Sequence, residues 1–451
     1  MSNLITDNFE TSSAAEWKQK IQFDLKGADY NETLLTKTLE GITIKPFYHA
    51  DDFEKLDIPS NTASFKICDT LTIENETETN HFAIESISNG VNAIQFIANK
   101  PFNIEVLFNN LLHKNIDFHF QFNFLSEAFI DELSNFLKNE NVYLNIDTIG
   151  NLAKTGNWFY SLTEDFKILN AIISKNTAKQ HLSVNSAIYQ NAGANTVQQI
   201  AYTLAHANEY LQNLGEKTAN KIQFIVAVGS NYFFEIAKLR ALKYLFKLLL
   251  NEYNVTAKIN IFAQPTLRNK TLYDYNVNML RTTTESMSAI LGGANSISNC
   301  PYNVLFKKHN NFGSRIARNQ LHILKEESYI TQSEAIVNNS YYIEEITKQM
   351  AEKALDLFKN IEKSGGFLHQ LKEGTIQRKI QENATKEQAL FDSGELVLLG
   401  TNKYPNALDK MKNELETSPF QPKRVGKTLI IPIISKRLAE KLELKRLDDE
   451  A

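Results

Sequence analysis

Residues 117–124 read DFHFQFNF, and this stretch indicates the fold of the chain. Phenylalanine occupies every second position, and the residues between are Asp117, His119, Gln121 and Asn123. In a β-strand, successive side chains point to opposite faces, so the aromatic set lies on one face and the polar set on the other. A strand of a (β/α)8 barrel packs its outer face against helices. The polar set is therefore expected to face the barrel interior.

Weaker polar rows of the same kind occur in three later segments, at Asn145 and Asp147, at Ser183 and Asn185, and at Asn260 and Gln264. Buried polar groups are costly unless they are hydrogen-bonded or meet water or a ligand. The rows fit a barrel with a polar ligand channel through it. They fit equally well a closed core of polar side chains that satisfy one another, and the residues alone leave the two alternatives even.

Short β-rich runs alternate with longer segments of helical period from about Ser64 to Asn299, as in βα units with a parallel sheet. The strand candidates are Ser64–Cys68, Asn92–Ala98, Asp117–Phe124, Val142–Asp147, His181–Ala187, Lys221–Val228, Ala257–Gln264 and Ala294–Ser298. Helical stretches between them include Ser126–Asn139, Thr196–Glu216, Phe233–Glu252 and Asn278–Leu291. Eight such units match a (β/α)8 TIM barrel, for which ~250 residues is typical. A doubly wound open sheet is the alternative, but its glycine-rich turn after the first strand is missing.

Three regions follow from this pattern: an N-terminal arm (1–45), the barrel (46–330) and a C-terminal helical extension with a linker-like tail (331–451). The arm carries a helix around Glu16–Lys26 and then the extended run ITIKPFY. We expect the arm to contact a partner chain, because an extended arm cannot bury Trp17, Phe23 and Phe47 by itself. The alternative is an arm folded back on its own barrel.

The C-terminal extension begins with a long helix, Tyr341–Lys363, which the glycine pair 365–366 ends. A second helix over Gly374–Lys386 follows, Ser418–Lys427 reads as a linker, and a charged helix closes the chain after IIPII.

The composition argues against several classes of protein. The net charge is −4 with acids and bases spread throughout, so nothing points to nucleic acid. The apolar run Leu242–Leu250 contains two lysines, so no membrane span is expected. Acidic residues near the N-terminus speak against a secretory signal. Cys68 and Cys300 lie far apart and are expected to be reduced thiols of a cytoplasmic protein.

Common catalytic signatures are absent from the sequence: it has no P-loop, no GxGxxG after a strand, no GxSxG and no His/Cys cluster at metal-ligand spacing. Barrel active sites gather at the C-terminal ends of the strands. The titratable residues expected there are Asp69, Lys100, Asp147, Lys154, Tyr189, Tyr232 and Arg268. Their spacing reveals no acid/base or nucleophile/base pair. We therefore assign no catalytic, cofactor-binding or metal-binding residue.

Several stretches resemble the acyl-CoA mutases, and methylmalonyl-CoA mutase above all. They keep the family's order from about Trp17 to about Arg446. The stretches are EWKQKIQFDLKG, ITIKPFYHADD, VNSAIYQNAGANTVQQIAYTLAHANEYL (184–211), YFFEIAKLRALKYL (232–245), LRTTTESMSAILGGANSIS (280–298), GSRIARNQLHILKEES (313–328), KSGGFLHQLKEGTIQRKIQENA and LGTNKYPN.

This resemblance implies a (β/α)8 barrel whose polar interior admits the CoA chain, capped in catalytic members by a flavodoxin-like cobalamin domain. The inward polar rows fit that ancestry, which favours an inherited channel over a closed core. It also implies an isomerase of propionate metabolism. In that reaction, homolysis of adenosylcobalamin generates a radical that interconverts methylmalonyl-CoA and succinyl-CoA.

The sequence departs from the family pattern at the positions that carry this chemistry. Catalytic members have a Tyr-His pair just after the fifth strand, where AIYQNAGA places Ala187 and Ile188. Isoleucine cannot donate a hydrogen bond to a thioester carbonyl. In place of the family's carboxylate-binding arginine stands Lys154, which cannot form a bidentate fork. The expected tyrosine near the end of strand one is missing from ICDTLTIENETETN, and the cobalt-ligating DxHxxG motif does not occur.

Resemblance and departures together predict the small, non-catalytic subunit of a heterodimeric methylmalonyl-CoA mutase, with no cobalamin domain of its own. The predicted partner is a large catalytic subunit in 1:1 ratio, which would hold the adenosylcobalamin. The alternative is a catalytic acyl-CoA mutase barrel that works with a separate cobalamin-carrying protein. A degenerate carboxylate clamp would then imply another substrate.

Overall fold

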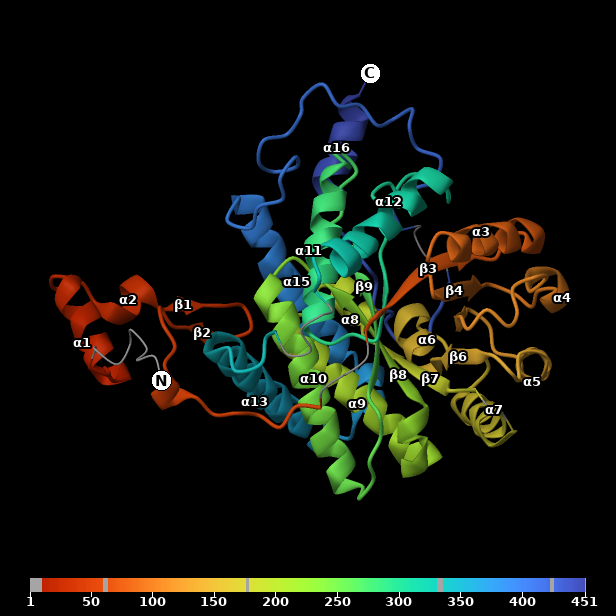
Figure 1. Cartoon of the computed structure of the whole chain (residues 1–451), viewed down its shortest axis with the longest axis horizontal. Coiled ribbons are helices and arrows are strands. Elements are labelled where there is room, and N and C mark those ends of the chain that lie inside the picture. Colours follow the sequence, from red (N-terminus) through yellow and green to blue (C-terminus); the bar gives the residue numbers. More distant parts are fainter. Residues whose placement is uncertain (1–9, 60–63, 176–177, 331–335, 422–425, 451) are drawn as a thin grey trace, which may run out of the picture.

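The computed structural model describes residues 10–59, 64–175, 178–330, 336–421 and 426–450. Its centre is a closed barrel of eight parallel strands in the order β10-β3-β4-β5-β6-β7-β8-β9. Helices surround the barrel, and the N-terminal arm extends away from it (Figure 1). The prediction of a (β/α)8 barrel is confirmed.

The barrel strands agree with the expected runs to within a few residues. They are β3 (Lys66–Thr72), β4 (Ala93–Ala98), β5 (Asp117–Phe122), β6 (Asn141–Ile146), β7 (Gln180–Asn185), β8 (Ile222–Val228), β9 (Asn260–Pro265) and β10 (Ser296–Ser298). The first strand runs four residues further than the predicted Ser64–Cys68, because Cys68 to Thr72 pair in register with the next strand. Ala187, predicted at the end of a strand, begins a short helix.

Helices cover the outside of the barrel and form most of the C-terminal extension. Those between strands are α3 (Glu76–Ser88), α4 (Ile104–Leu107), α5 (Glu127–Phe136), α6 (Thr148–Thr155), α7 (Leu162–Lys175), α8 (Ala187–Asn191), α9 (Thr196–Leu214), η3 (Glu216–Lys221), α10 (Tyr232–Glu252) and α11 (Val277–Leu291). After the barrel come α12 (Asn311–His322), η4 (Ile323–Glu327), α13 (Tyr341–Lys363), α14 (Phe367–Lys372), α15 (Thr375–Ser393) and α16 (Glu440–Asp449). Within the described ranges, no helix is both long and apolar enough to cross a membrane.

The alternation of DFHFQFNF has the expected structural consequence. Phe118 and Phe120 are fully buried outside the barrel sheet, where their rings contact Phe96 and Phe108. Aromatic pairs of this kind stabilise a core beyond their buried area by ~0.5–1.5 kcal/mol each. The polar face of the same strand is thereby directed into the barrel.

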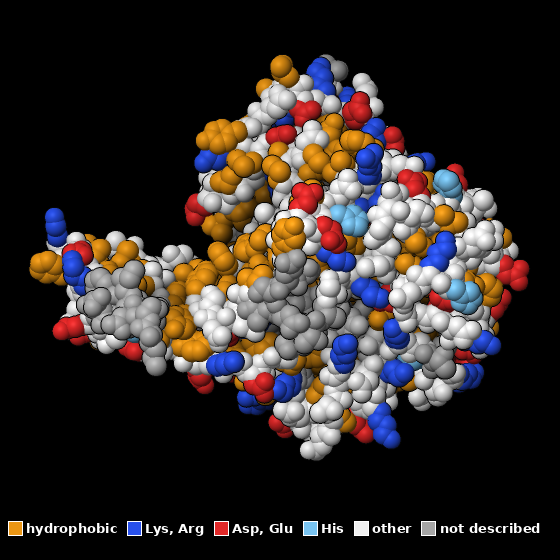
Figure 2. All heavy atoms as spheres, viewed as in Figure 1, with side chains coloured by type: hydrophobic (Ala, Val, Ile, Leu, Met, Phe, Trp, Pro, Cys, Tyr) orange, Lys and Arg blue, Asp and Glu red, His pale blue; other side chains and the backbone are white. Residues whose placement is uncertain are grey.

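The arm comprises α1 (Ala14–Asp24), α2 (Tyr30–Leu34), a hairpin of β1 (Thr36–Lys37) with β2 (Thr43–Ile44), and η2 (Ala50–Asp52). Helix α1 buries none of its residues. The hairpin packs near α13, where Gln349 accepts a hydrogen bond from the Thr43 amide. Figure 2 shows the arm projecting from the body, with hydrophobic side chains on its surface and where it meets the body.

Several contacts tie the C-terminal extension to the barrel, among them the following two. Helix α13 packs along α9 and α10, and Gly365 and Gly366 at its end have positive φ, as the predicted stop requires. A small second core joins the loop after β9 to the tail. Its buried members are Leu272, Tyr273, Leu305, Phe306 and Met411. The predicted linker Ser418–Lys427 lies partly outside the described residues.

Candidate functional site

The interior of the barrel is filled by side chains that meet across it. The imidazole of His119 on β5 lies 5.0 Å, centroid to centroid, from the ring of Phe262 on β9. In the closed strand order these two strands are four apart and therefore opposite. His119 also stacks on Tyr143 at 4.2 Å. Contact between opposite walls closes the lumen at this level.

Hydrogen bonds join the polar side chains inside the barrel. Nδ1 of His119 lies 3.1 Å from Oε1 of Gln223, whose Nε2 donates to Oδ1 of Asn260 at 3.0 Å. Thr70 donates to Gln95 at 2.9 Å and lies 2.7 Å from the Ser298 hydroxyl. The predicted inward orientation of His119 is thus confirmed, whereas Asn123 lies beyond the end of β5 and is exposed. At the level of His119, side chains from opposite walls meet, while Nε2 of His119 and Nε2 of Gln95 are buried without a hydrogen-bond partner.

Burial in this network lowers the pKa of His119 to about 4, although the carboxylate of Asp117 acts in the opposite direction. Asp117 itself forms a 2.7 Å ion pair with Lys66. The imidazole is therefore neutral at physiological pH and serves as a hydrogen-bonding and stacking group.

One predicted inward residue, Asp147, points the other way. The pairing of β6 with β7 shifts register between Tyr143 and Ile146, and Asn145 adopts a positive φ of 48°. A bulge of this kind reverses the alternation of faces beyond it. The carboxylate of Asp147 consequently contacts α9, which covers the outside of the sheet, and the prediction was wrong.

Asp147 belongs to a buried network formed with Tyr189, His206 and Tyr210. The Tyr189 hydroxyl lies 2.8 Å from Nδ1 of His206, and Nε2 of His206 lies 3.0 Å from Oδ1 of Asp147. The Tyr210 hydroxyl donates to the same oxygen at 2.9 Å. The ring of Phe367 on α14 stacks over His206 with an interplanar angle of 9°. His206 was not singled out from the sequence, because its partners lie 17 and 59 positions away.

The carboxylate of Asp147 is held in its charged form. Burial alone would raise its pKa, but His206 and hydrogen bonds from the amides of Gly150 and Asn185 outweigh burial and lower the pKa. Burial and the nearby Asp147 charge raise the pKa of Tyr189 well above its usual range. Tyr189, His206 and Tyr210 are all inaccessible to solvent. The network links the segments after β6 and β7 to α9 and presents no group to a substrate.

The positions that departed from the family pattern lie at the C-terminal ends of the strands. Ala187 is buried and Ile188 half-buried in α8, directly after β7. Lys154 is exposed in the last turn of α6. The first two side chains carry no hydrogen-bonding group, so neither can act on a carbonyl.

The other titratable residues expected at the barrel mouth are dispersed. Asp69 lies within β3, where it binds Arg318 at 2.7 Å, so its predicted place at the mouth was wrong. Lys100 is exposed after β4, and Tyr232 is half-buried at the start of α10. Arg268 is held by Glu387 at 2.6 Å. Among the expected residues, the structure joins Asp147 and Tyr189, through His206.

Both ring nitrogens of His206 face partners within the buried network, and His119 lies inside the filled barrel. No group of three or more His, Cys, Asp or Glu in the described ranges could hold a metal ion.

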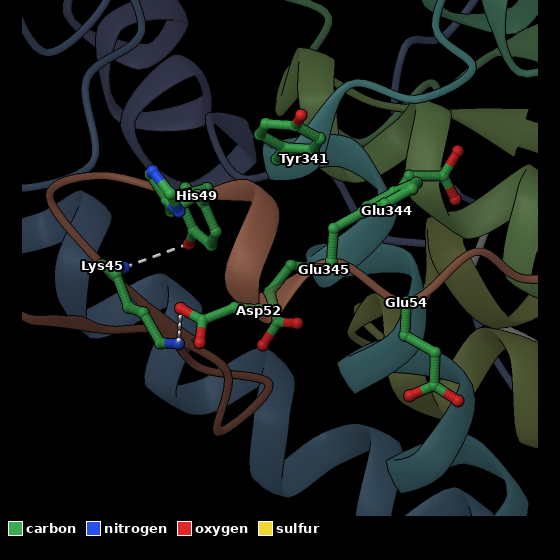
Figure 3. A pocket seen from close by; sticks show the side chains of 9 residues that line it. Lys45, His49, Asp52, Glu54, Tyr341, Glu344 and Glu345 are labelled. Atoms are coloured by element: carbon green, nitrogen blue, oxygen red, sulfur yellow. Dashed lines mark hydrogen bonds and ion pairs between the residues drawn. The ribbon is translucent and has the colours of Figure 1, made fainter. Parts of the chain in front are cut away.

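A pocket lies away from the barrel, at the root of the arm (Figure 3). Its walls come from the segment 45–54 and the first residues of α13. They are Lys45, Tyr48, His49, Asp52, Phe53, Glu54, Tyr341, Glu344 and Glu345. Lys45 and Asp52 point toward each other at 3.9 Å, and Glu54 pairs with Lys348 of α13. Ion pairs and aromatic contacts such as Tyr48–Tyr342 connect the arm to the body here.

The sequence and this geometry were compared with known proteins. The model of the family described as "Methylmalonyl-CoA mutase" matches residues 137–437. The chain is 30% identical over 445 residues to the methylmalonyl-CoA mutase small subunit of Porphyromonas gingivalis, covering 88% of this chain and 70% of that protein. It is 32% identical over 234 residues to the methylmalonyl-CoA mutase of Cereibacter sphaeroides. It is 28% identical over 233 residues to the large subunit from Porphyromonas gingivalis. The last two matches each cover 49% of this chain and 33% of the relative.

Proposed function

The chain belongs to the methylmalonyl-CoA mutase family, and from that premise we propose that it is the small, non-catalytic subunit of a heterodimeric mutase. The holoenzyme interconverts methylmalonyl-CoA and succinyl-CoA, and the large subunit carries the catalytic residues. The match to a small subunit over 88% of the chain supports this role.

The filled barrel is the observation that carries the proposal. A catalytic barrel of this family admits the CoA chain through its interior. Here His119 and Phe262 from opposite strands are in contact, and Gln223 and Asn260 continue the hydrogen-bonded network. Inserting a ligand at this level would require breaking buried hydrogen bonds, each of which leaves unsatisfied groups costing ~1–3 kcal/mol.

The cofactor belongs to the partner in this proposal. Mutases of this family depend on cobalamin, and the DxHxxG motif whose histidine ligates cobalt in the family does not occur in this sequence. Adenosylcobalamin would be held by the large subunit and would supply the radical there. This chain would contribute its frame and its surface.

The N-terminal arm is the part that we propose contacts the large subunit. Helix α1 has 11 residues and buries none of them, while Trp17 and Phe23 are 47% and 79% exposed. An isolated helix of this length is marginally stable in water. The alternative was an arm folded back on its own barrel. It describes the hairpin, because the root of the arm packs on α13, but it does not describe α1, which remains uncovered.

The test is to purify the chain alone and with a methylmalonyl-CoA mutase large subunit, and to assay methylmalonyl-CoA turnover with adenosylcobalamin. We expect a stable 1:1 complex whose turnover is unchanged by Tyr189→Phe or Lys154→Ala in this chain. Replacing the catalytic histidine of the large subunit should abolish turnover.

Two results would contradict the proposal. One is turnover by this chain together with a small cobalamin protein that lacks a mutase barrel, which would favour the alternative of a catalytic barrel. The other is the absence of any complex with the large subunit. As a control for folding, both variants of this chain should elute as the wild-type complex does on size exclusion.

A further inference from the structure

The segment 428–439, here called the strap, crosses one side of the barrel mouth. Its backbone amides donate to carbonyls in the segments that follow three different strands. Ile433 donates to Ala153 after β6, Lys436 to Asn191 after β7, and Leu438 to Arg268 after β9, at 2.7, 2.9 and 2.9 Å. The strap thus bridges the rim from the end of β6 to the end of β9.

The barrel is shaped to receive the strap. Gly156, at the end of α6, has φ of 82° and accepts hydrogen bonds from the amides of Leu429 and Ile430. A Cβ atom at Gly156 would lie 2.7 Å from the Ile430 carbonyl oxygen and from the Cβ of Thr428. Glycine is therefore required for this close approach as well as for the positive φ.

Two arginines join the strap and the segment after β9 reciprocally. Arg268 of that segment donates to the Lys436 carbonyl on the strap at 2.7 Å, and its Nε binds Glu387 of α15 at 2.6 Å. Arg437 of the strap donates to the Lys270 carbonyl of the segment and to Glu443 of α16. Both guanidinium groups are buried, where charge-assisted hydrogen bonds are stronger than neutral ones.

Apolar burial holds the stretch 428–436 of the strap weakly. Ile430 and Ile433 are buried there, but Leu429, Ile431 and Ile434 are 70%, 67% and 52% exposed. A segment with few buried apolar contacts opens at low free energy compared with the core. At the C-terminal end of the strap, Leu438 and Ala439 are buried in a small core of their own, so this core and the polar latch together attach the strap.

We propose that the strap is a releasable cover over the rim between the ends of β6 and β9, latched by Arg268 and Arg437. In the closed state it shields the segments after β6, β7 and β9. Release exposes them together, because each contributes a carbonyl to the same strap. This inference does not rest on the proposed function, and its test needs neither partner nor substrate.

The experiment is hydrogen–deuterium exchange on the full chain, read in the strap and in the fully buried strand β8. We expect Arg268→Ala to speed exchange of the strap amides by about tenfold or more while β8 stays protected. Peptides covering α6 and α8 should speed up with the strap. Lys436→Ala is the matched control, since Lys436 engages Asn191 and Arg268 through its main chain, and it should leave exchange unchanged.

If Arg268→Ala fails to fold, Glu387→Gln weakens the same latch from the partly exposed face of α15. If the strap amides of the folded variants exchange as slowly as those of the wild type, the proposed role of the two arginines as a latch is contradicted. If amide exchange in β8 speeds up as much as in the strap, the strap does not open separately from the core. If the strap amides of the wild type are unprotected, the closed state is contradicted.

Discussion

At the scale of single residues, several side chains of types that often act in catalysis are buried and have structural roles. His206, Tyr189 and Asp147 are connected as in a relay, yet they are buried beneath Phe367. His119 stacks and bonds within the barrel rather than facing a ligand. A buried polar group stabilises a fold when all its partners are present and destabilises it when one is removed.

Replacing His206 with leucine should lower the free energy of unfolding by ~1–3 kcal/mol, because the Tyr189 hydroxyl and the Asp147 carboxylate lose a buried partner. Urea unfolding at neutral pH measures the change. His81→Leu is the control, since His81 is exposed on α3, and it should change stability by less than ~0.5 kcal/mol. Equal effects of the two variants would contradict a stabilising role of the network.

Stability should depend on pH through His119. Its pKa is about 4 when folded and near 6.5 when unfolded, so the unfolded chain binds a proton first as the pH falls. This stabilisation is complete above pH 6.5 and is lost as the pH falls from 6.5 toward 4. Between pH 7.5 and 5 it amounts to about 2 kcal/mol.

The measurement is urea unfolding at both pH values for the wild type and for His119→Gln, which cannot titrate. The loss on acidification should shrink by about that amount in the variant. His81→Gln, at an exposed position on α3, should retain the wild-type loss. An unchanged loss in His119→Gln would contradict the buried neutral imidazole.

At the scale of elements, helix α1 is weakly attached, because none of its residues is buried. It touches the rest of the arm through Trp17, which stacks on Phe47 at 4.9 Å, and through the Ala14 amide, which binds Asp51. The hairpin and the segment 45–54 are anchored on α13 instead. The helix is thus dispensable for the barrel and available to a partner.

Deleting residues 1–28 should leave the urea midpoint of the barrel unchanged, because α1 buries no residue. It should weaken binding to the large subunit at least about tenfold, as the exposed aromatic surface is lost. Isothermal titration measures the affinity. Leu408→Ala, at an 88% exposed apolar residue of the C-terminal extension, serves as control and should bind normally. Unchanged affinity of the deletion would contradict a partner-contacting arm.

At the scale of the whole molecule, an arm with little buried surface is joined to a barrel with a large continuous core. Buried apolar area sets how much free energy a region gains on folding. The two regions should therefore unfold at different denaturant concentrations in the isolated chain. The sequence contains two tryptophans, one in each region, Trp17 and Trp158.

Fluorescence of Trp158→Phe then reports on the arm, and that of Trp17→Phe reports on the barrel. We expect the arm signal to change at least ~1 M urea below the barrel signal. Circular dichroism at 222 nm, dominated by the barrel helices, provides the reference. Coincident transitions of the two variants would mean that arm and barrel form one cooperative unit.

Much of the fold could be predicted from the chain. The alternation of DFHFQFNF, the eight βα units and the glycine stop after α13 follow from local periodicity and backbone preference, which act within a few residues. The motifs that follow the family's order along the chain also indicated the family. For the candidate site, the family resemblance pointed to Ala187, Ile188 and Lys154, which stand in AIYQNAGA and NLAKTGNWFY where the family has its catalytic residues.

The tertiary structure determined how the candidate residues are oriented and which residues they contact. The bulge at Asn145 turned Asp147 outward, and no local pattern announced it. The contact between His119 and Phe262 joins residues 143 positions apart, and the Arg268–Lys436 bond joins residues 168 positions apart. Periodicity determined which face each side chain takes, since that depends on neighbouring residues. Strand register and barrel closure determine whether side chains from opposite walls meet or leave a channel, and where the strap can pack. Both exist only in the folded chain.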